Sequence, residues 1–284
     1  MQKLSEKFMK TIFFTAALVS VIAVILICLF LGINGILTIK KIGVKDFLTG
    51  TLWQPLKGLY GILPMIIGSI YVTAGAIILG VPLGLLCAVF LAHFCPKWLY
   101  RILKPATDLL AGIPSIVYGF FGLTVIVPLI QRLFGGSGKG VLAASLILGI
   151  MILPSVISIS EAALRAVPKS YYEGALALGA THEKGVYSVS LPAAKSGIAA
   201  GIVLGVGRAI GEAMAVSMVA GNQPIIPGSI LSGVRTLTSN IVLEMGYAEG
   251  LHRDALIATG VVLFVFILII NIMFSLLTSK ERKK

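Results

Sequence analysis

The sequence contains little charge for its length. Only 12% of its 284 residues are Asp, Glu, Lys or Arg, whereas a soluble domain carries about 25%. Hydrophobic residues make up 57%, and the mean hydropathy is +1.02. This composition excludes an ordinary soluble globular protein and indicates an integral membrane protein.

Cysteine is also scarce. The three cysteines, Cys28, Cys87 and Cys95, lie in or at the ends of apolar runs. They do not have the spacing of a disulfide framework or a metal site, and the three histidines are scattered. The sequence therefore predicts no disulfide, no metal centre and no cofactor.

A nucleotide-binding motif is missing too. The glycine-rich segment 135–140 resembles part of a P-loop, but the motif needs Ser or Thr after Lys139, where Gly140 stands. We therefore expect that the chain is not an enzyme. Any ATP hydrolysis coupled to its activity would take place on a partner subunit.

Long apolar runs are abundant. About 20 residues of helix cross the hydrocarbon core of a bilayer, and six runs reach that length. They cover roughly residues 11–36, 65–93, 109–131, 141–160, 196–221 and 255–278. The first run is too long for a secretory signal, so we expect it to be retained. The sequence thus predicts an all-α membrane protein with six transmembrane helices and both termini on one side.

The net charge of +12 is distributed unevenly along the chain. With the N-terminus inside, the cytoplasmic segments hold fourteen Lys and Arg residues and the external segments hold eight. Four lysines between Lys40 and Lys57 run against this bias. The distribution nevertheless predicts cytoplasmic termini and contact with membrane lipid, with no nucleic acid partner.

The chain divides into two predicted parts. Residues 1–63 form an N-terminal transmembrane helix with an external segment, and residues 64–284 form the remaining transmembrane domain. Only two connections within the second part are long, at 161–195 and 222–254, and loops of that length usually have structure or function of their own. In the external one, residues 234–245 could form a helix that lies at the interface or dips inward.

The cytoplasmic connection contains two predicted short helices. Ser170 and Glu173 have the S-x-x-E spacing of a capping box, which predicts a helix over 171–178. Gly179 can adopt the positive φ that ends a helix. A second helix is predicted over 182–190. Two helices around a glycine turn would form a compact knob suited to docking in a groove.

Arg208 and Glu212 are full charges inside the fifth apolar run. Arg208 would lie about 18 Å from the membrane surface, where a charge costs about 2.5–3.5 kcal/mol. Four residues apart on a helix, the two side chains would share a face. One interpretation is an internal ion pair that only permits packing. The other is an anion site, because a guanidinium presents donors suited to phosphate oxygens.

Glu212 could provide selectivity at such a site. Phosphate near neutral pH still carries a proton that a carboxylate can accept, whereas sulfate does not. Ser115 and Tyr118 of the third run could add hydroxyl groups to the path. Alternatively, Tyr118 is a packing aromatic whose hydroxyl has a local partner.

Residues 173–192 resemble the cytoplasmic coupling loop of ABC importer permeases. That loop runs Glu-Ala-Ala, three residues, Gly, nine residues, an aliphatic residue, one residue and Leu-Pro. The matching positions are Glu173, Ala175, Gly179, Val189, Leu191 and Pro192. Only Gly174 departs from the pattern, in place of the middle Ala.

Three further segments, at 110–122, 208–216 and 234–245, are similar to phosphate importer permeases of the PstC type. The resemblance implies a type I ABC importer fold in a bacterial or archaeal plasma (inner) membrane. It implies as partners a PstA-type permease in a heterodimer, two ATP-binding subunits and an external phosphate-binding protein, with phosphate as substrate. Arg208 and Glu212 would line the translocation path.

The resemblance also assigns the contact with the ATP-binding subunits. The residues implied are Glu173, Gly174, Ala175, Gly179, Leu191 and Pro192. The alternative function is a proton-coupled secondary anion transporter in which Glu212 carries protons. Such transporters are typically built from inverted repeats with broken helices in both halves, whereas this chain has one asymmetric cytoplasmic loop.

Overall fold

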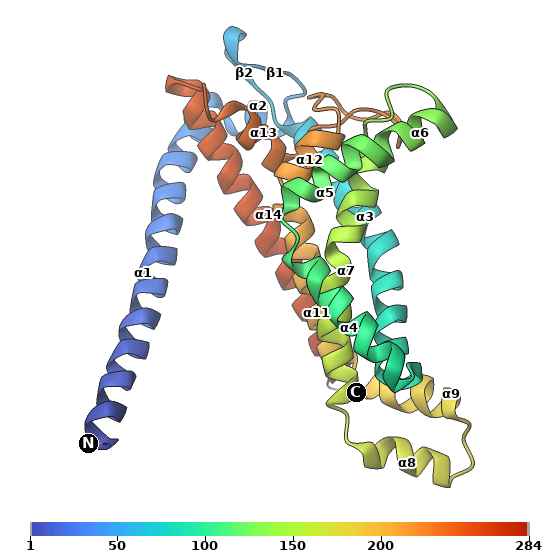
Figure 1. The fold of residues 1–284 in the computed structure, drawn as a ribbon. Helices are drawn as coiled ribbons and strands as arrows, with labels where there is room; N and C mark the ends of the chain where they lie inside the picture. Colours follow the sequence, from blue (N-terminus) through green and yellow to red (C-terminus); the bar gives the residue numbers. More distant parts are fainter. Residues whose placement is uncertain (1, 283–284) are drawn as a thin grey trace.

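The structure is a computed structural model that describes residues 2–282, with side chains from residue 8 to residue 273. It is a bundle of helices with one small hairpin (Figure 1). The N-terminal part comprises α1 (Gln2–Ile42), α2 (Val44–Thr49), β1 (Trp53–Gln54), the 3₁₀ turn η1 (Pro55–Lys57) and β2 (Leu59–Tyr60). Next come α3 (Leu63–Val89), the π-helical turn η2 (Phe90–Phe94), α4 (Lys97–Gly112), α5 (Ser115–Phe121), the π-helical turn η3 (Gly122–Ile126), α6 (Val127–Phe134) and α7 (Val141–Arg165).

The second half continues with α8 (Lys169–Ala177), α9 (His182–Gly185), the π-helical turn η4 (Val186–Ser190), α10 (Leu191–Ala193), α11 (Lys195–Gly211), α12 (Met214–Val219), α13 (Leu237–Glu244) and α14 (Gly250–Arg282). The only strand pairing among the named strands of the described chain is antiparallel, with Trp53 opposite Tyr60.

Five helices of the described chain are long and apolar enough to cross a membrane. They are Phe8–Ile42, Leu63–Phe94, Ser115–Phe134, Val141–Arg165 and Gly250–Met273. A sixth candidate is the pair His182–Ala193 and Lys195–Gly211, which is bent by 69°. The predicted all-α membrane fold is confirmed, with five spans or up to six.

The predicted third span, 109–131, is not one helix. Its first residues belong to α4, and the helix breaks at Ile113, whose ψ is 125°. The cause is Pro114, because the ring of a proline disfavours the α conformation of the residue before it. A new helix, α5, begins at Ser115. The apolar run is therefore shared between two helices joined by an extended residue.

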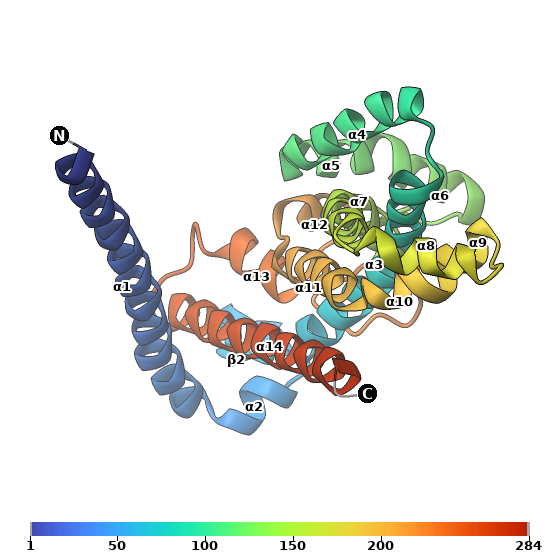
Figure 2. The ribbon, with the colours of Figure 1, turned by 90° about the horizontal axis from the view of Figure 1, so that it is seen from below.

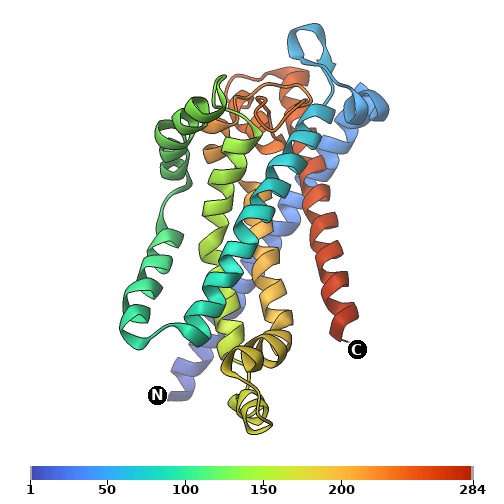
Figure 3. The same ribbon diagram turned by 90° about the vertical axis from the view of Figure 1, so that its right-hand side faces the viewer.

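Small residues bring α3, α7 and α11 into close contact at the centre of the bundle (Figures 2 and 3). A Cβ atom at Gly80 of α3 would lie 2.7 Å from the carbonyl oxygen of Gly149 in α7. On α11, a Cβ at Gly205 would lie 3.0 Å from Val156. Glycine at these positions permits helix approach in lipid, where dispersion contacts drive association.

Helix α1 lies at the edge of the bundle and packs on α14 (Figure 2). A Cβ at Gly35 would lie 2.3 Å from the side chain of Val261, so glycine is required at this crossing. The hairpin then covers an apolar cluster with α13 and α14. Its most buried members include Phe47, Ile62, Leu237 and Leu256. The division of the chain at residue 63 stays a prediction.

The two ends of the bundle carry different elements. The start of α1, the end of α14 and the segment α8–α9 lie at one end, and the hairpin and α13 lie at the other (Figure 1). Within the segment 222–254, the predicted helix 234–245 is shorter than expected, because α13 begins only after Thr236. The Thr236 side chain accepts a hydrogen bond from the Ser239 N–H and so caps the helix.

Candidate functional site

The two charges in the fifth apolar run lie at a helix break. Arg208 is in the last turn of α11, which ends at Gly211, and Glu212 has extended backbone (φ −73°, ψ 123°). The prediction that they share one helix face is therefore wrong. Oε1 of Glu212 accepts a hydrogen bond from the Ala215 N–H at 3.0 Å, and its carbonyl oxygen accepts one from Thr238 at 2.9 Å. The two bonds give hydrogen-bond partners to the Ala215 N–H and to the Glu212 carbonyl oxygen, which lie where the helix is interrupted.

Arg208 has no counter-ion in the part of the chain that the structure describes. Its side chain is half-buried, and no described residue forms a hydrogen bond or an ion pair with it. The internal ion pair with Glu212 is thus absent. On either side of Arg208, a Cβ at Gly207 or Gly211 would meet no atom within 4 Å. Arg208 therefore lies beside an open, small-residue surface of α11.

The helix α5 lies close to this break. Tyr118 is buried, and its hydroxyl donates a 2.8 Å hydrogen bond to the carbonyl oxygen of Leu110. The Arg208 charge is within electrostatic range of Tyr118. Ser115 is half-buried in the first turn of α5. The structure thus brings Tyr118 and Arg208 near one another, but the proton of the Tyr118 hydroxyl is already donated to Leu110.

Close packing joins α5 to the far side of the break. A Cβ at Gly119 would lie 2.9 Å from the Cα of Ala215 in α12. Since Ala215 is the residue whose N–H binds Glu212, α5 and the α11–α12 break form one packed unit.

The segment 169–193 forms the predicted pair of helices around a turn. Gly179 has φ +83°, in the region that favours glycine, and α8 ends just before it. Thr181 then caps α9 by accepting a hydrogen bond from the Lys184 N–H. The predicted capping box at Ser170 is wrong, because Ser170 lies inside α8, which begins at Lys169. The helix begins there because Pro168 disfavours helical backbone in Val167, the residue that precedes the proline.

The two short helices pack against each other through aromatic groups. The Tyr172 hydroxyl shares a hydrogen bond with Nδ1 of His182 at 2.5 Å, and the ring of Tyr172 lies over Gly185. Phe94, the last residue of η2, contacts His182 edge-on, with ring centroids 4.7 Å apart. The knob is therefore held to the transmembrane helices as one body.

The outer surface of this knob is exposed. Glu173, Gly174, Gly179 and Pro192 are exposed, whereas Ala175 and Leu191 are half-buried. Several large apolar side chains also point outward, among them Tyr171, Leu176, Leu178 and Tyr187. An exposed apolar patch of this kind is typical of a protein interaction site.

Two buried carboxylates were not predicted from the sequence. Glu161 of α7 binds Tyr100 and Lys104 of α4 and Arg165 of its own helix. The i,i+4 spacing of Glu161 and Arg165 at the end of an apolar run could have indicated their ion pair from the sequence. Lys104 and Tyr100 on α4 are 57 and 61 residues from Glu161, and no sequence pattern links them to it.

The other buried carboxylate, Glu244, ties the hairpin to the helix bundle. It accepts hydrogen bonds from Trp53 at 2.8 Å, from Arg235 at 2.5 Å and from His252 at 2.8 Å. Burial alone would raise the pKa of Glu244, but these bonds outweigh it and lower the pKa below its ordinary value. No periodicity in the sequence connects Trp53 with residues almost 200 positions later.

These features define a class of protein: a helical membrane protein with a projecting docking knob and, at a helix break, an arginine that has no counter-ion among the described residues. The family model described as "Binding-protein-dependent transport system inner membrane component" matches residues 80–283. The chain belongs to this family.

Two relatives and one solved structure illustrate the similarity. The chain is 41% identical over 270 residues to the probable ABC transporter permease protein YqgH of Bacillus subtilis, covering 91% of this chain and 87% of the relative. It is 34% identical over 293 residues to the phosphate transport system permease protein PstC of Haemophilus influenzae, covering 96% and 92%. The fold is similar to a bacterial ABC transporter involved in the import of alginate, with TM-score 0.66, 16% identity and coverage of 98% and 99%.

Family membership identifies the chain as a multi-pass inner membrane permease subunit with the type I ABC importer fold. Such a subunit is a transport component and not an enzyme. It works with another permease subunit, with ATP-hydrolysing subunits and with a binding protein. The alternative of a proton-coupled secondary transporter finds no support in these comparisons.

Proposed function

We propose that the chain is the PstC-type permease subunit of an ATP-driven phosphate importer. It would form the translocation path with a PstA-type permease, receive phosphate from an external binding protein and be driven by two ATP-binding subunits. The similarity to the phosphate permease PstC of Haemophilus influenzae supports the choice of phosphate.

One observation carries the proposal at the level of the site. Arg208 is a permanent charge at the end of a membrane-inserted helix, and the described residues of this chain supply no counter-ion for it. A buried charge without a partner is costly, so it must face water, an anion or a group from another subunit. The open surface beside Gly207 and Gly211 gives an anion room to approach the guanidinium.

Glu212 is the proposed selectivity group. One carboxylate oxygen is held by the Ala215 N–H, and the other has no hydrogen-bond partner among the described residues. That second oxygen can accept the proton of hydrogen phosphate. Sulfate has no proton to offer and would be repelled. Ser115 can donate a further hydrogen bond from the start of α5, and Tyr118 could do so only after releasing Leu110.

The knob is the proposed contact with the ATP-binding subunits. Glu173, Gly174 and Gly179 are exposed on its surface, and Ala175 and Leu191 are half-buried. Pro192 lies just before the 69° bend that leads into α11. In this proposal the knob and both termini are cytoplasmic, and the hairpin and α13 are external.

The mechanism follows from this arrangement. Closure of the ATP-binding subunits would displace the knob, and the bend at Ala194 would pass the displacement to α11. Because Arg208 is at the opposite end of α11, its access would change from one side of the membrane to the other. Phosphate would bind the guanidinium from outside and leave toward the cytoplasm after hydrolysis.

Uptake of labelled phosphate into proteoliposomes that contain the complete transporter tests this function. Arg208→Gln removes the charge and should lower uptake by about tenfold or more, because hydrogen bonds to charged groups contribute about 1.5–3 kcal/mol. Arg132→Gln, at an exposed arginine near the end of α6, is the matched control and should change uptake by less than about twofold. Wild-type-like uptake by Arg208→Gln would contradict the proposal.

A further inference from the structure

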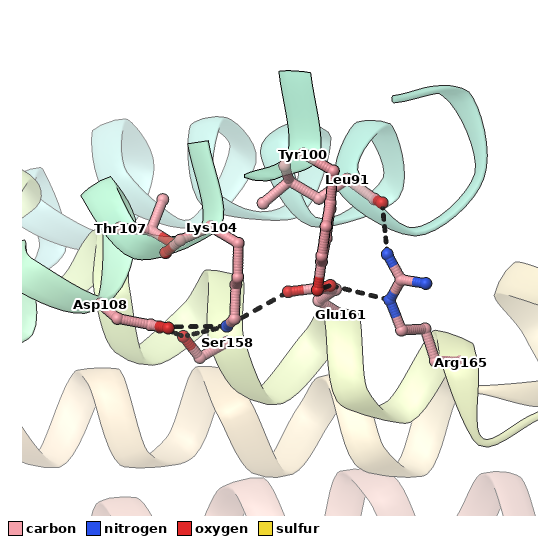
Figure 4. Close-up of polar contacts among 8 residues, drawn as sticks. All are labelled: Leu91, Tyr100, Lys104, Thr107, Asp108, Ser158, Glu161 and Arg165. Carbon is pink, nitrogen blue, oxygen red and sulfur yellow. Dashed lines mark hydrogen bonds and ion pairs between the residues drawn. The ribbon is translucent and has the colours of Figure 1, made fainter. Parts of the chain in front are cut away.

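Glu161 connects α7 to α4 through a compact polar cluster (Figure 4). Its Oε1 accepts hydrogen bonds from the Tyr100 hydroxyl at 2.7 Å and from Nε of Arg165 at 2.8 Å. Its Oε2 forms an ion pair with Nζ of Lys104 at 3.3 Å. The Glu161 side chain is only 3% exposed, whereas its partners Lys104 and Arg165 are 25% and 46% exposed.

The cluster has a second layer that orients Lys104 and Arg165. Lys104 also contacts Asp108 at 3.1 Å and the Ser158 hydroxyl at 3.2 Å. Arg165 donates to the carbonyl oxygen of Leu91 at 2.8 Å, and its guanidinium lies 4.6 Å from the centre of the Tyr100 ring. The cations that hold Glu161 are thus themselves fixed in position.

This cluster is the principal attachment of α4 to the bundle. None of the residues of α4, all of which the structure describes, is buried. Its large apolar side chains Trp98, Ile102 and Leu109 are 60–73% exposed. Since apolar packing contributes so little here, the position of α4 depends on the polar contacts with α7.

One end of the cluster leads to the knob. Arg165 is the last residue of α7, and α8 begins only four residues later at Lys169. Leu164 is buried in a common apolar cluster with Val186 of the knob, and Tyr172 of α8 packs against that cluster. A displacement of the knob therefore reaches Arg165 at the end of α7. Glu161 lies one helical turn before Arg165.

The other end leads to the proposed anion site. The carbonyl oxygen of Leu110, near the end of α4, accepts the hydrogen bond from Tyr118 of α5. Helix α5 packs in turn on Ala215 beside Glu212. The sequence of contacts runs from the knob through α7, α4 and α5 to the helix break without a gap.

We propose that Glu161 is a positioning residue that makes α4 move together with the knob, so that displacement by the ATP-binding subunits reaches the transport path through α4 and α5. This route is additional to the one through the bend at Ala194. The inference rests on the proposed function. It predicts that loss of the Glu161 charge separates ATP hydrolysis from transport while leaving the subunits assembled.

The test compares phosphate uptake with ATP hydrolysis in the same reconstituted, complete transporter. Glu161→Gln should lower the number of phosphates moved per ATP by about tenfold, the range of a typical coupling energy. Asp254→Asn is the matched control, because it removes an exposed carboxylate of α14, outside this cluster. This control should keep the ratio within about twofold of wild type.

A second variant guards against a simple folding defect. Tyr100→Phe keeps the ring and removes only the hydroxyl that binds Glu161, so it should lower the same ratio by a smaller factor. The amide oxygen that Glu161→Gln introduces can still accept this hydrogen bond, so the two changes remove different contacts, and the double variant should lower the ratio further than Glu161→Gln alone. Gel filtration and the melting temperature establish that each variant transporter is assembled.

An unchanged number of phosphates moved per ATP in Glu161→Gln would overturn the inference, whether uptake and hydrolysis both stay at the wild-type level or both fall in equal proportion. This result differs from failure of the proposed function. If the wild-type transporter moves no phosphate at all, the proposed function itself is wrong, and the inference falls with it.

Discussion

The hydroxyl of Tyr118 donates a hydrogen bond to the carbonyl oxygen of Leu110 across the helix break at Pro114. The last carbonyl groups of a helix lack their usual partners within the helix. The carbonyl oxygen of Leu110 accepts a long 3.4 Å bond from the Ile113 N–H, and the Tyr118 hydroxyl gives it a shorter one. This shorter bond also fixes the angle between α4 and α5 next to Arg208. The relationship assigns Tyr118 a role in holding the break, independent of any contact with substrate.

Tyr118→Phe should therefore reduce stability more than substrate affinity. The loss of one neutral hydrogen bond costs about 0.5–1.5 kcal/mol, which chemical denaturation of the purified transporter would measure. The KM for phosphate should stay within about twofold of wild type, since the hydroxyl proton is already used. A large rise in KM with unchanged stability would instead place the hydroxyl on the substrate.

The fold was predictable where long apolar runs or special backbone residues decide it. The six runs and the turn at Gly179 depend on local physics, namely hydrophobic length and positive φ. The sequence shows that Pro114 would disturb the helix, but not whether it would bend the helix or end it. That outcome depends on which groups bind the carbonyl oxygens near the break, and here the Tyr118 hydroxyl binds that of Leu110. Likewise, the carbonyl oxygen of Glu212, just after the end of α11, accepts a hydrogen bond from Thr238, which is distant in the sequence.

The candidate site was predictable in its residues but not in its geometry. Charges in an apolar run identify Arg208 and Glu212 directly from sequence. Helical spacing then suggested a pair, which the break prevents. The clusters of Glu161 and Glu244 also join residues 57 to 191 positions apart, and these long-range pairs have no periodic signal in the sequence; only the spacing of Glu161 and Arg165 has one.

Gly174 and Gly179 offer a matched comparison in the knob. A Cβ at either position would meet no atom within 4 Å, so only backbone conformation distinguishes them. Gly174→Ala should stabilise α8 by about 0.5–1 kcal/mol, because alanine is the better helix former. Gly179→Ala should destabilise the knob by about 1–2 kcal/mol, because φ is +83°.

Hydrogen exchange of residues 169–193 in the purified transporter measures both effects. Protection should rise in Gly174→Ala and fall in Gly179→Ala. Equal effects of the two substitutions would mean that backbone conformation does not govern the stability of the knob.

Glu244 should make the attachment of the hairpin sensitive to acid. Its pKa is lowered in the folded state by Trp53, His252 and Arg235 against the effect of burial. The stability that it contributes is therefore complete above its unfolded pKa of about 4.3 and is lost as pH falls through the folded pKa. Tyr247 lies nearby but is not charged in this range.

The measurement is the difference in unfolding free energy between wild type and Glu244→Gln as a function of pH. This difference should be present at neutral pH and should shrink as pH falls below about 4.3. Between about pH 8 and pH 5 the charge of His252 also changes, so only the acidic range below about pH 4.3 tests Glu244. A difference that grows below about pH 4.3 has the opposite sign and would refute the assignment.

Glu212→Gln separates the structural role of this side chain from its charge. A glutamine oxygen can still accept the hydrogen bond from the Ala215 N–H, so the break should persist. Without the carboxylate, sulfate should compete with phosphate at least about tenfold better, which corresponds to roughly 1.4 kcal/mol. Uptake of labelled phosphate in the presence of sulfate measures this; unchanged uptake and unchanged sulfate rejection would contradict a selectivity role.

The central claim, that Arg208 binds the transported anion, is tested most directly by an electron cryo-microscopy map of the assembled transporter with phosphate. We expect anion density about 2.7–2.9 Å from the guanidinium nitrogens, the usual length of a charge-assisted hydrogen bond. Density elsewhere in the path, with Arg208 paired to a carboxylate of the other permease subunit, would contradict the claim.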